Sequence, residues 1–524
     1  MSGKLLKSGI IVSTMTLLSR VLGLLRDVVV ANLMGAGAAA DVFFFANKIP
    51  NFLRRLFAEG AFAQAFIPVL SEVKHQGEFS DLRLFIARVA GSLGVIVTLV
   101  TLVGVIGSPL LAALFGTGWF VEYLNDGPGA DKYLLASSML KITFPYLLFV
   151  SLTGLSGAIL NTLNRFAVAA FTPVLLNVAI IGCAIWLAPQ FEQPAFALAW
   201  GVFLGGVLQL VFQLPFLYRA GVLVKPQWGW RDPQVQKVRK LMIPALFGVS
   251  VGQLNLLFDT LIASFLMTGS ISWLYYSDRL LEFPLGLFGI AIATVILPTL
   301  SSNHVTKDDA AFAGNMDWAV KMVCILGIPA ATGLAVLAEP MLLTIFQRGA
   351  FTPQDATMAS YSLIAYSTGL LSFMLVKVLA PGFFSRQDTK TPVKFGIWCM
   401  AANMVFNLVL AIPFGYVGLA TATAMSSSLN ALLLYITLHR QGVYRVSNHT
   451  LSLVLRIVLA SVAMAATLLY LTPPIADWLS RSLADKALLL GGLIGVGGLT
   501  FFVVLLILGV RPRDYRGHVD VRGA

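Results

Sequence analysis

Residues 218–240 read YRAGVLVKPQWGWRDPQVQKVRK and hold six basic side chains near the middle of a 524-residue chain. Long apolar runs lie on both sides of this segment and recur along the whole length. The chain is 58% hydrophobic and 11% charged, whereas soluble domains carry about 25% charged residues. This composition excludes a soluble fold and predicts an all-α polytopic membrane protein, in which the basic segment connects two halves.

Fourteen windows of about 20 or more mostly apolar residues predict fourteen transmembrane helices. The first window follows Lys4 and Lys7 but lacks a small-residue cleavage site, so it is predicted to be the first helix and not a signal peptide. The predicted helices span residues 8–34, 41–70, 84–108, 133–160, 166–188, 195–218, 241–267, 272–300, 318–338, 356–383, 392–412, 415–437, 452–472 and 487–510.

Basic residues are distributed unequally between the two sets of connections. With a cytoplasmic N-terminus, 24 Lys and Arg residues lie in cytoplasmic segments or within the first five residues of the span that follows, and 4 lie in outside loops. The positive-inside rule therefore predicts that both termini are cytoplasmic. The six bases of residues 218–240 have two possible explanations. The positive-inside rule alone accounts for them, or the segment also contacts acidic lipid headgroups. The net charge of +12 is thus no sign of a nucleic-acid partner.

The chain resembles itself at an offset of about 230 residues, which indicates an internal repeat. Asp27 matches Asp259, and Pro68 matches Pro298. Helices 1–6 and 7–12 are therefore predicted to form two parallel six-helix repeats, an arrangement typical of transporters with a substrate site between the halves. Helices 13 and 14 lie outside the repeat and are either packing helices or a surface for a hydrophobic tail. The predicted parts are residues 1–219 (N-lobe), 220–240 (basic cytoplasmic linker), 241–440 (C-lobe) and 441–524 (helices 13 and 14 with a basic cytoplasmic tail).

Apart from the bases counted at the cytoplasmic ends, fourteen ionisable residues lie within the predicted spans, where each costs about 3 kcal/mol or more if it faces lipid. They must therefore pair with one another or line water. For Lys141 and Lys377, a structural role and a role in transport are equally good interpretations. The set comprises Arg20, Arg26, Asp27, Asp41, Lys48, Arg54, Arg55, Glu59, Lys141, Asp259, Asp278, Arg279, Glu282 and Lys377.

Helices 1 and 2 carry the highest concentration of these charges. On helix 2, Arg55 and Glu59 are spaced as an i,i+4 pair. Residues 47–51 contain Pro50, which removes a backbone hydrogen bond, so this stretch is predicted to interrupt helix 2 as a packing kink or as part of a binding site. Planar guanidinium groups grip phosphate oxygens bidentately. The deep arginines therefore predict a transporter whose cationic cavity binds a phosphate or diphosphate anion.

Motifs of catalysis and metal binding are missing from the sequence. It contains no G-x-x-x-x-G-K-[ST] stretch for an ATPase and no polar cluster suited to glycosyl or phosphoryl chemistry. The three cysteines lie in apolar runs and the five histidines in polar connections. We expect neither an enzyme nor a resident organic cofactor.

Several short motifs together are typical of one transporter family. They are Ser19–Gly23, Arg26–Asp27, Ala40–Asp41, Pro50–Arg55, Ala58–Gly60, Tyr275–Leu280 and Lys377–Asp388. By these motifs the whole chain, helices 13 and 14 included, closely resembles the MurJ (MviN) family of lipid II flippases of bacterial peptidoglycan synthesis, in the multidrug/oligosaccharidyl-lipid/polysaccharide exporter superfamily. The resemblance implies a protein of the bacterial cytoplasmic (inner) membrane. Such a protein flips lipid II, the undecaprenyl-diphosphate-linked disaccharide-pentapeptide, from the inner to the outer leaflet by alternating access.

The resemblance also implies roles for particular residues. Arg26 and Asp27 would face Arg279 across the lobes, around the diphosphate. Helices 13 and 14 would form the groove for the polyprenyl tail. The required cavity arginines would be Arg20, Arg26, Arg54 and Arg279, and the other expected transport residues are Arg55 and, for gating and polar contacts, Asp41, Glu59, Ser272 and Glu282.

Some members of this family bind sodium in the C-terminal lobe. The matching positions here are Asp259, Asn403, Asn407 and Thr423. Asn407 supplies an oxygen without a charge, so a Na⁺ site and a protonated or water-solvated Asp259 without an ion both remain open.

The expected partners are lipid II, membrane lipids and cell-wall synthesis proteins. Two rival functions remain. A multidrug or O-antigen-type exporter would share the two-lobed fold but typically has twelve helices, without helices 13 and 14. A polyprenyl-phosphate-processing membrane enzyme would need a polar catalytic cluster in a loop.

Overall fold

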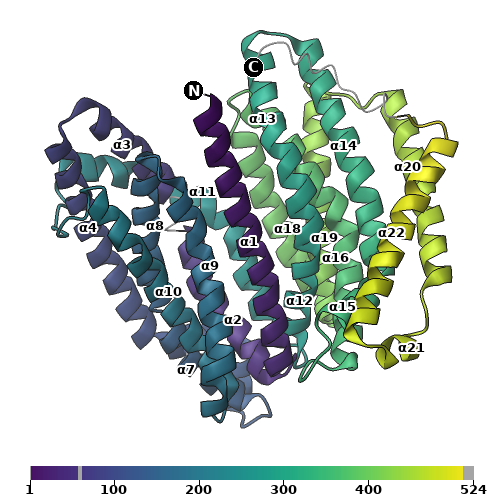
Figure 1. Cartoon of the computed structure of the whole chain (residues 1–524), viewed down its shortest axis with the longest axis horizontal. Helices are drawn as coiled ribbons and strands as arrows, with labels where there is room; N and C mark the ends of the chain where they lie inside the picture. Colours follow the sequence, from purple (N-terminus) through teal and green to yellow (C-terminus); the bar gives the residue numbers. More distant parts are fainter. Residues whose placement is uncertain (1, 57–61, 512–524) are drawn as a thin grey trace. The chain divides into compact units, whose positions relative to one another are not determined.

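The computed structural model describes residues 2–56 and 62–511, and within these residues every regular element is a helix. The chain divides into two compact units, residues 1–272 and 273–524. The first unit contains α1 (Ser2–Met34), α2 (Ala38–Arg54), α3 (Phe62–Gln76), α4 (Phe79–Ile106), α5 (Ser108–Phe115), α6 (Thr117–Leu124), α7 (Ala130–Thr143), α8 (Tyr146–Thr162), α9 (Phe166–Gly182), α10 (Pro194–Arg219) and α11 (Pro233–Ala263) (Figure 1).

Helix α12 (Ser270–Pro284) begins at the end of the first unit and continues into the second. The second unit goes on with α13 (Ile290–Val305), α14 (Asp309–Val336), α15 (Ala338–Ile345), α16 (Pro353–Leu379), α17 (Pro381–Phe384), α18 (Lys390–Phe414), α19 (Tyr416–Arg440), α20 (Asn448–Leu471), α21 (Ile475–Ser480) and α22 (Leu483–Ile507).

Eleven helical stretches of the described chain are long and apolar enough to cross a membrane. They coincide with predicted spans 3 to 6 and 8 to 14. The other three predicted spans correspond to α1, to α2 with α3, and to α11. The expected all-α membrane fold is confirmed, and the number of fourteen spans stays a prediction.

Several predicted spans are divided or bent. The helix predicted over residues 41–70 is described as α2 and α3, and residues 57–61 between them lie outside the described residues. The span predicted over 133–160 is divided at Pro145, between α7 and α8, and the span over 272–300 passes through a π-helical turn, Leu285–Gly289, just after Pro284. Proline lacks the N–H group that continues a helical ladder, so each of these places is a point where the helix can change direction.

Short helices occupy connections that were predicted as loops. Helix α5 follows α4, and α15 follows α14, so a short helix comes after the third helix of each predicted repeat. Helix α21 connects α20 with α22. These segments have only six to eight residues, too few to cross a membrane, so hydropathy over a 20-residue window does not distinguish them from loops.

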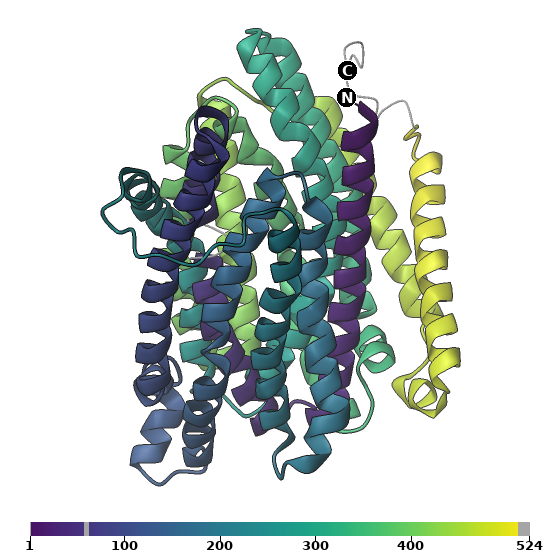
Figure 2. The ribbon, with the colours of Figure 1, turned by 60° about the vertical axis from the view of Figure 1, so that its left-hand side comes forward.

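In the first unit, α9 packs between α1 and α10 (Figure 1). Glycine permits the close approach of α9 and α10, since a β-carbon at Gly201 would lie 2.9 Å from Cα of Ile180. Residues 222–229 form an extended chain that crosses neighbouring helices of this unit (Figure 2). Asp232 then caps α11 by accepting from the N–H groups of Gln234 and Val235, at 2.9 and 3.2 Å. The predicted linker, 220–240, is thus part extended chain and part helix. The division of the chain into lobes stays a prediction.

In the second unit, α20 packs against α14 and α22 (Figure 1). Near the start of α20, the Asp317 carboxylate of α14 accepts from the hydroxyl of Thr450, at 2.7 Å, and from that of Tyr444, at 3.0 Å. Lys321 lies 2.9 Å from the same carboxylate. Burial raises the pKa of the Tyr444 phenol, which therefore stays protonated and acts as a donor.

The opposite end of this helical pair is attached through α21 and the start of α22. The Trp478 indole N–H donates to the Thr344 hydroxyl at 3.1 Å. Lys486 Nζ donates to the Gln347 amide oxygen at the same distance. Helices α20 and α22 are therefore attached to the rest of the second unit at both ends.

Candidate functional site

The second half of α1 carries an ion pair that is fixed to α9. Arg26 donates from Nε and Nη2 to Oδ1 of Asp27, at 3.0 and 2.7 Å, and from Nη1 to Oδ1 of Asn177, at 3.0 Å. The Asn177 amide also donates to the Ser19 carbonyl oxygen, at 3.2 Å. Asp27 is buried and the Arg26 side chain is 13% exposed, whereas Arg20 is exposed. The two expected arginines of α1 thus differ, because a hydrogen bond to α9 holds Arg26 whereas Arg20 is exposed.

Asn177 was not among the expected site residues. It lies in the predicted span 166–188, where it stands out as an amide in an otherwise apolar run. That polarity is a signal that sequence analysis could use, because a polar group within a membrane span is expected to find a partner. The identity of the partner depends on how α1 and α9 pack, which the sequence does not state.

Two cations of α2 connect this helix with α11. Lys48 Nζ donates to the Thr260 hydroxyl at 3.1 Å, and Arg55 Nη1 donates to the Gln253 amide oxygen at 3.4 Å. Each pair of positions is two turns apart on its own helix, and the order is reversed on α11. The two helices therefore run antiparallel along this contact.

The other expected residues of this segment are Arg54 and Glu59. Arg54 donates from Nε to the Asn51 amide oxygen at 3.1 Å, and its side chain is partly exposed. The predicted pair of Arg55 with Glu59 lies outside the described residues, which do not include 57–61.

The predicted interruption of helix 2 at residues 47–51 is wrong, because α2 continues through Pro50 to Arg54. Pro50 removes the N–H that would bond to the Ala46 carbonyl. The hydroxyl of Thr143, on α7, donates to this carbonyl instead, at 3.0 Å, and the Asn51 amide donates to the carbonyl of residue 47 at 2.8 Å. A neighbouring helix thus replaces the missing bond, and α2 remains continuous at this point.

At the other end of α2, Asp41 is buried and accepts three hydrogen bonds. The donors are the N–H of Gly269, at 2.7 Å, and the N–H and hydroxyl of Ser272, at 2.9 and 2.6 Å. These donors surround the start of α12, where backbone N–H groups lack partners within the helix and the helix dipole favours a negative charge. Asp41 and Ser272 were both expected to serve gating and polar contacts, and the structure places them in direct contact. Gly269 was missed because it contributes only a backbone group.

Two further bonds attach the connection between α11 and α12 to α6 and α7. The Gly118 N–H donates to the buried Ser264 hydroxyl at 2.9 Å, and a β-carbon at Gly118 would lie 2.3 Å from the Ser264 carbonyl oxygen. Lys132 Nζ donates to the Thr268 hydroxyl. The connection 264–272 is therefore held by α2, α6 and α7 together.

On α12, Arg279 lies among polar groups of its own helix. Its Nη1 donates to a carboxylate oxygen of Glu282 at 2.9 Å, and Nε and Nη2 both approach the Tyr275 hydroxyl oxygen, at 3.2 and 3.1 Å. The guanidinium carbon also lies 5.1 Å from the centre of the Tyr275 ring, within range of a cation–π interaction. Arg279 and Glu282 are thus paired, and Tyr275 is an added contact. The expected approach of Arg279 to Arg26 and Asp27 stays a prediction.

The expected cation ligands fall on three helices. Asn403 and Asn407 are buried one turn apart on α18, and the Thr423 hydroxyl of α19 donates to the Leu419 carbonyl at 3.0 Å. Asp259 lies on α11, in the first unit. The described residues contain no group of three or more His, Cys, Asp and Glu side chains that could hold a metal ion. Any cation on α18 and α19 would therefore be held mainly by neutral oxygens, a ligand type that alkali ions accept and transition metals do not favour.

Comparison with known proteins places these residues in a family. The family model for the lipid II flippase MurJ matches residues 30–486. A probable lipid II flippase MurJ of Vibrio cholerae is 63% identical over 519 residues, which cover 99% of each chain. The chain belongs to the MurJ family of lipid II flippases.

The fold is also that of the MurJ family. A solved lipid II flippase MurJ in an inward closed conformation has 27% identity and a TM-score of 0.79, and the match covers 95% of this chain and 98% of that one. An inward-facing multidrug resistance transporter of the MATE family, in the MOP superfamily, matches with 11% identity and a TM-score of 0.66 over 83% of this chain and 98% of that one. This second match shows the fold alone. MurJ proteins are transporters, so family membership confirms that this protein is a transporter and not an enzyme.

Proposed function

We propose that this protein moves lipid II from the inner to the outer leaflet of the bacterial cytoplasmic membrane, with both chain termini in the cytoplasm. Membership of the MurJ family supports the cargo. The guanidinium groups of Arg26, Arg54 and Arg279 carry the proposal for the site, since all three lie within predicted spans and each donates to a polar neighbour. Guanidinium groups bind diphosphate oxygens bidentately, so these side chains are suited to the charged part of the lipid.

The cargo has a long hydrocarbon tail, and α20 and α22 are the proposed surface for it. Large apolar side chains on both helices are exposed, including Leu469 (68%) and Leu488 (75%). Their attachment at both ends through Asp317 and Trp478 supports a surface of fixed geometry. An apolar tail on such a surface stays in a hydrocarbon environment while the diphosphate crosses among polar groups.

Alternating access requires that the contacts of residues 264–272 with α2, α6 and α7 open during the cycle. The several hydrogen bonds that this connection makes support the proposal. A contact held by several bonds at once is expected to be either closed or open, and the structure would be its closed state. Cysteines introduced at residues 35–40 and 268–270 should form a disulfide in that state and stop export. Continued export of lipid II by the crosslinked protein would contradict this step of the proposal.

The driving force has two candidates, a sodium ion and the membrane potential. The buried amides of Asn403 and Asn407 favour a cation of low charge on α18, and Asp259 is the expected carboxylate. Export into vesicles should be measured with sodium replaced by a large organic cation at fixed membrane potential. If the export rate does not change, and Asp259→Asn also exports at an unchanged rate, sodium is not the driving force and the membrane potential is the remaining candidate. Cell-wall synthesis proteins remain the proposed protein partners.

Alanine substitution of the arginines tests the proposed function as a whole. We expect Arg20→Ala, Arg26→Ala, Arg54→Ala and Arg279→Ala to insert into the membrane but to fail to support cell-wall synthesis when the wild-type protein is depleted. Arg440→Ala, at the exposed end of α19, is the matched control and should support growth. Lysine at 279 should restore only part of the function, because an ammonium group lacks the planar fork. Normal growth of all four variants would contradict the proposal that these arginines form the transport site.

A further inference from the structure

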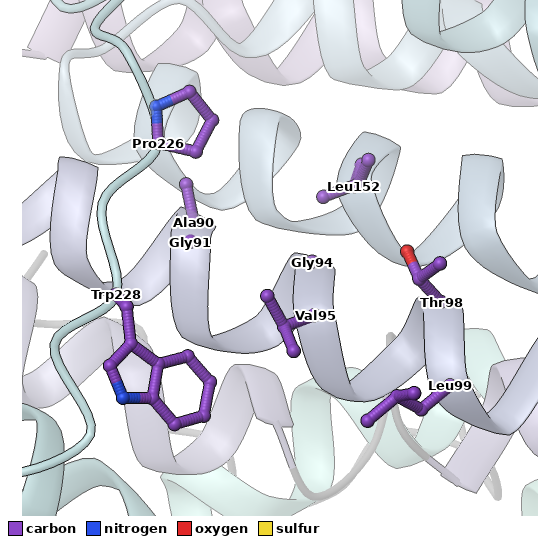
Figure 3. A pocket seen from close by; sticks show the side chains of 9 residues that line it. All are labelled: Ala90, Gly91, Gly94, Val95, Thr98, Leu99, Leu152, Pro226 and Trp228. Carbon is purple, nitrogen blue, oxygen red and sulfur yellow. The ribbon is translucent and has the colours of Figure 1, made fainter.

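The extended segment between α10 and α11 covers the side of α4 and leaves an apolar groove beside it. The groove has a volume of about 410 Å³ and is lined by Gly91, Gly94 and Leu99 of α4, by Leu152 of α8, and by Pro226 and Trp228 of the segment. Figure 3 shows the two segment residues crossing α4 beside Ala90 and Gly91, with Leu152 on the opposite wall. The volume lies in the range of roughly 300–1,000 Å³ that is common for sites that bind small molecules.

The segment is fixed to α4 by backbone contacts. The Gln227 N–H donates to the Ala87 carbonyl at 2.9 Å, and the Gly229 N–H donates to the Ser92 hydroxyl at 3.2 Å. A β-carbon at Gly91 would lie 2.0 Å from the Gln227 carbonyl oxygen, so only glycine allows this approach. The wall of the groove that Pro226 and Trp228 form is therefore a fixed part of the fold.

An exposed apolar surface continues from the groove along α4, as is expected of a surface that faces the hydrocarbon of a membrane. Val95, Leu99 and Val103 lie at i, i+4 and i+8 on α4 and are 44%, 57% and 71% exposed, so they form an apolar stripe that continues from the groove. The lining residues of α4 run from Ala90 to Leu99, a rise of about 13 Å. This length is close to half of a hydrocarbon core of about 30 Å. The groove thus has the depth of one leaflet.

The entrance of the groove has the chemistry of a membrane interface that attracts anions. Trp228 is 60% exposed and stacks on Trp230, with ring centres 5.8 Å apart. The Arg239 guanidinium lies 4.2 Å from the centre of the Trp230 ring. Tryptophan is enriched at the level of lipid headgroups.

Further basic side chains surround this entrance. Lys225 and Arg231, on either side of the two tryptophans, are exposed. The one acidic side chain of residues 218–240, Asp232, forms an ion pair with Arg88 of α4 and is 11% exposed. The surface around the groove is therefore basic, which matches an anionic headgroup.

We infer that this groove binds one acyl chain of an anionic glycerophospholipid, with its phosphate beside Lys225 and Arg231. The assignment to the inner leaflet rests on the proposed cytoplasmic position of the segment. Lipid binding here does not depend on transport of lipid II, so either proposal can fail without the other.

Quenching of Trp228 fluorescence by brominated lipids tests the site. The full chain is placed in vesicles of phosphatidylcholine and phosphatidylglycerol in which one of the two lipids carries brominated acyl chains, and the spectrum of Trp228→Phe is subtracted to isolate Trp228. At equal mole fraction, brominated phosphatidylglycerol should quench at least about fivefold more effectively, because each basic residue near an anionic surface contributes about that factor. Equal quenching by the two lipids would overturn the proposal.

Substitutions distinguish the acyl chain from the headgroup. A β-carbon at Gly94 would meet no atom within 4 Å, so Gly94→Leu fills the groove without disturbing the fold and should remove the preference. Thr98→Phe narrows the same groove from another position and should do the same. Gly396→Leu, on α18, is the matched control, since this glycine is also partly exposed with open space around it.

Lys225→Gln combined with Arg231→Gln should lower the preference for phosphatidylglycerol while quenching by both lipids persists. If the preference for phosphatidylglycerol persists in both Gly94→Leu and Thr98→Phe, the acyl chain does not bind in this groove and the proposal is wrong. Displacement of the brominated lipid by undecaprenyl phosphate at equal mole fraction would assign the groove to a polyprenyl chain and would also overturn the proposal.

Discussion

The two ends of α2 are held in different ways, although both carry charged side chains. At the N-terminal end, the buried Asp41 carboxylate accepts bonds of 2.6 to 2.9 Å from Gly269 and Ser272. At the C-terminal end, Arg54 and Arg55 are partly or fully exposed and donate to amide oxygens at 3.1 and 3.4 Å. Charge-assisted bonds are typically about 2.7–2.9 Å long, so only the first set has the geometry of a strong contact.

This difference indicates which contacts of α2 can change during transport. Breaking the contact at Asp41 leaves several buried donors without an acceptor, which makes that contact an all-or-none event. The contacts of the arginines are longer and more exposed, so a phosphate oxygen can replace an amide oxygen at little cost. We therefore expect substitutions at the two ends to have effects of different kind and size.

The largest effect is expected for Asp41→Ala. The change leaves the N–H groups of Gly269 and Ser272 and one hydroxyl without their acceptor, at about 1–3 kcal/mol each, which corresponds to a shift of at least about 100-fold in the population of the contact. The yield of a disulfide between residues 35–40 and 268–270 should fall accordingly, and export with it. Asp131→Ala removes an exposed acid of α7 and is the control. A normal disulfide yield in Asp41→Ala would show that the carboxylate does not hold the two segments together.

A smaller effect, confined to transport, is expected for Arg54→Ala. A hydrogen bond to a charged group contributes about 1.5–3 kcal/mol, so export should fall by about tenfold or more while the thermal unfolding temperature stays unchanged. Arg54→Lys should keep the charge and lose the bidentate grip, and its export rate should lie between the two. Equal loss of stability and export would mean that Arg54 supports the fold.

The next effect concerns the bond that carries α2 past its proline. Thr143→Val removes the hydroxyl that donates to Ala46 and should lower the free energy of unfolding by about 1–2 kcal/mol. Pro50→Ala restores the backbone donor, so Thr143→Val should cost much less in that background. Thermal unfolding of the two single variants and the double variant measures this coupling. Additive effects would show that the hydroxyl and the proline act independently.

The smallest effect is expected at Asp388, which has the same kinds of donor as Asp41 but little burial. It accepts from the N–H and hydroxyl of Thr391, at 3.1 and 2.6 Å. The hydroxyl bond from Thr391 is the main reason why the pKa of Asp388 lies below its usual value. A lowered pKa stabilises the fold above the ordinary value of about 3.9, and this contribution is lost as the pH falls through the folded pKa.

Thr391→Val should therefore raise the pKa of Asp388 toward its ordinary value, which a carboxylate titration by NMR would detect. Asp388→Asn should change the free energy of unfolding by no more than about 0.5 kcal/mol at neutral pH, as is usual for substitutions near the surface, because Asp388 is only partly buried. A loss as large as that of Asp41→Ala would mean that burial does not explain the difference between the two carboxylates.

Much of this architecture follows from the sequence because long apolar runs have few alternatives in a membrane. The spans at α4, α10 and α18 to α20 agree with the predicted ranges within a few residues, and the expected transport residues Asp41 and Ser272 are in contact. Continuity through Pro50 was missed, because it depends on a hydroxyl from residue 143, far away in sequence.

The partners of the charged residues were the least predictable part. Asn177 and Tyr275 contact Arg26 and Arg279, but which amide or phenol reaches a guanidinium depends on helix rotation and packing. The sequence gives the angular position of a residue on its own helix and does not give the angle between two helices. Backbone donors such as the Gly269 N–H carry no side-chain signal at all.

The attachment of α20 through Asp317 limits how such a protein can be shortened. Deletion of residues 441–511 would strip the Tyr444 and Thr450 hydroxyls from a carboxylate that is 16% exposed, at a cost of about 1–3 kcal/mol for each lost bond, and would leave it with Lys321 on a surface newly open to lipid. A truncated twelve-helix chain would therefore need compensating substitutions at both positions to remain soluble in the bilayer. Gain or loss of this helical pair during evolution should accordingly be accompanied by changes at Asp317 and Lys321.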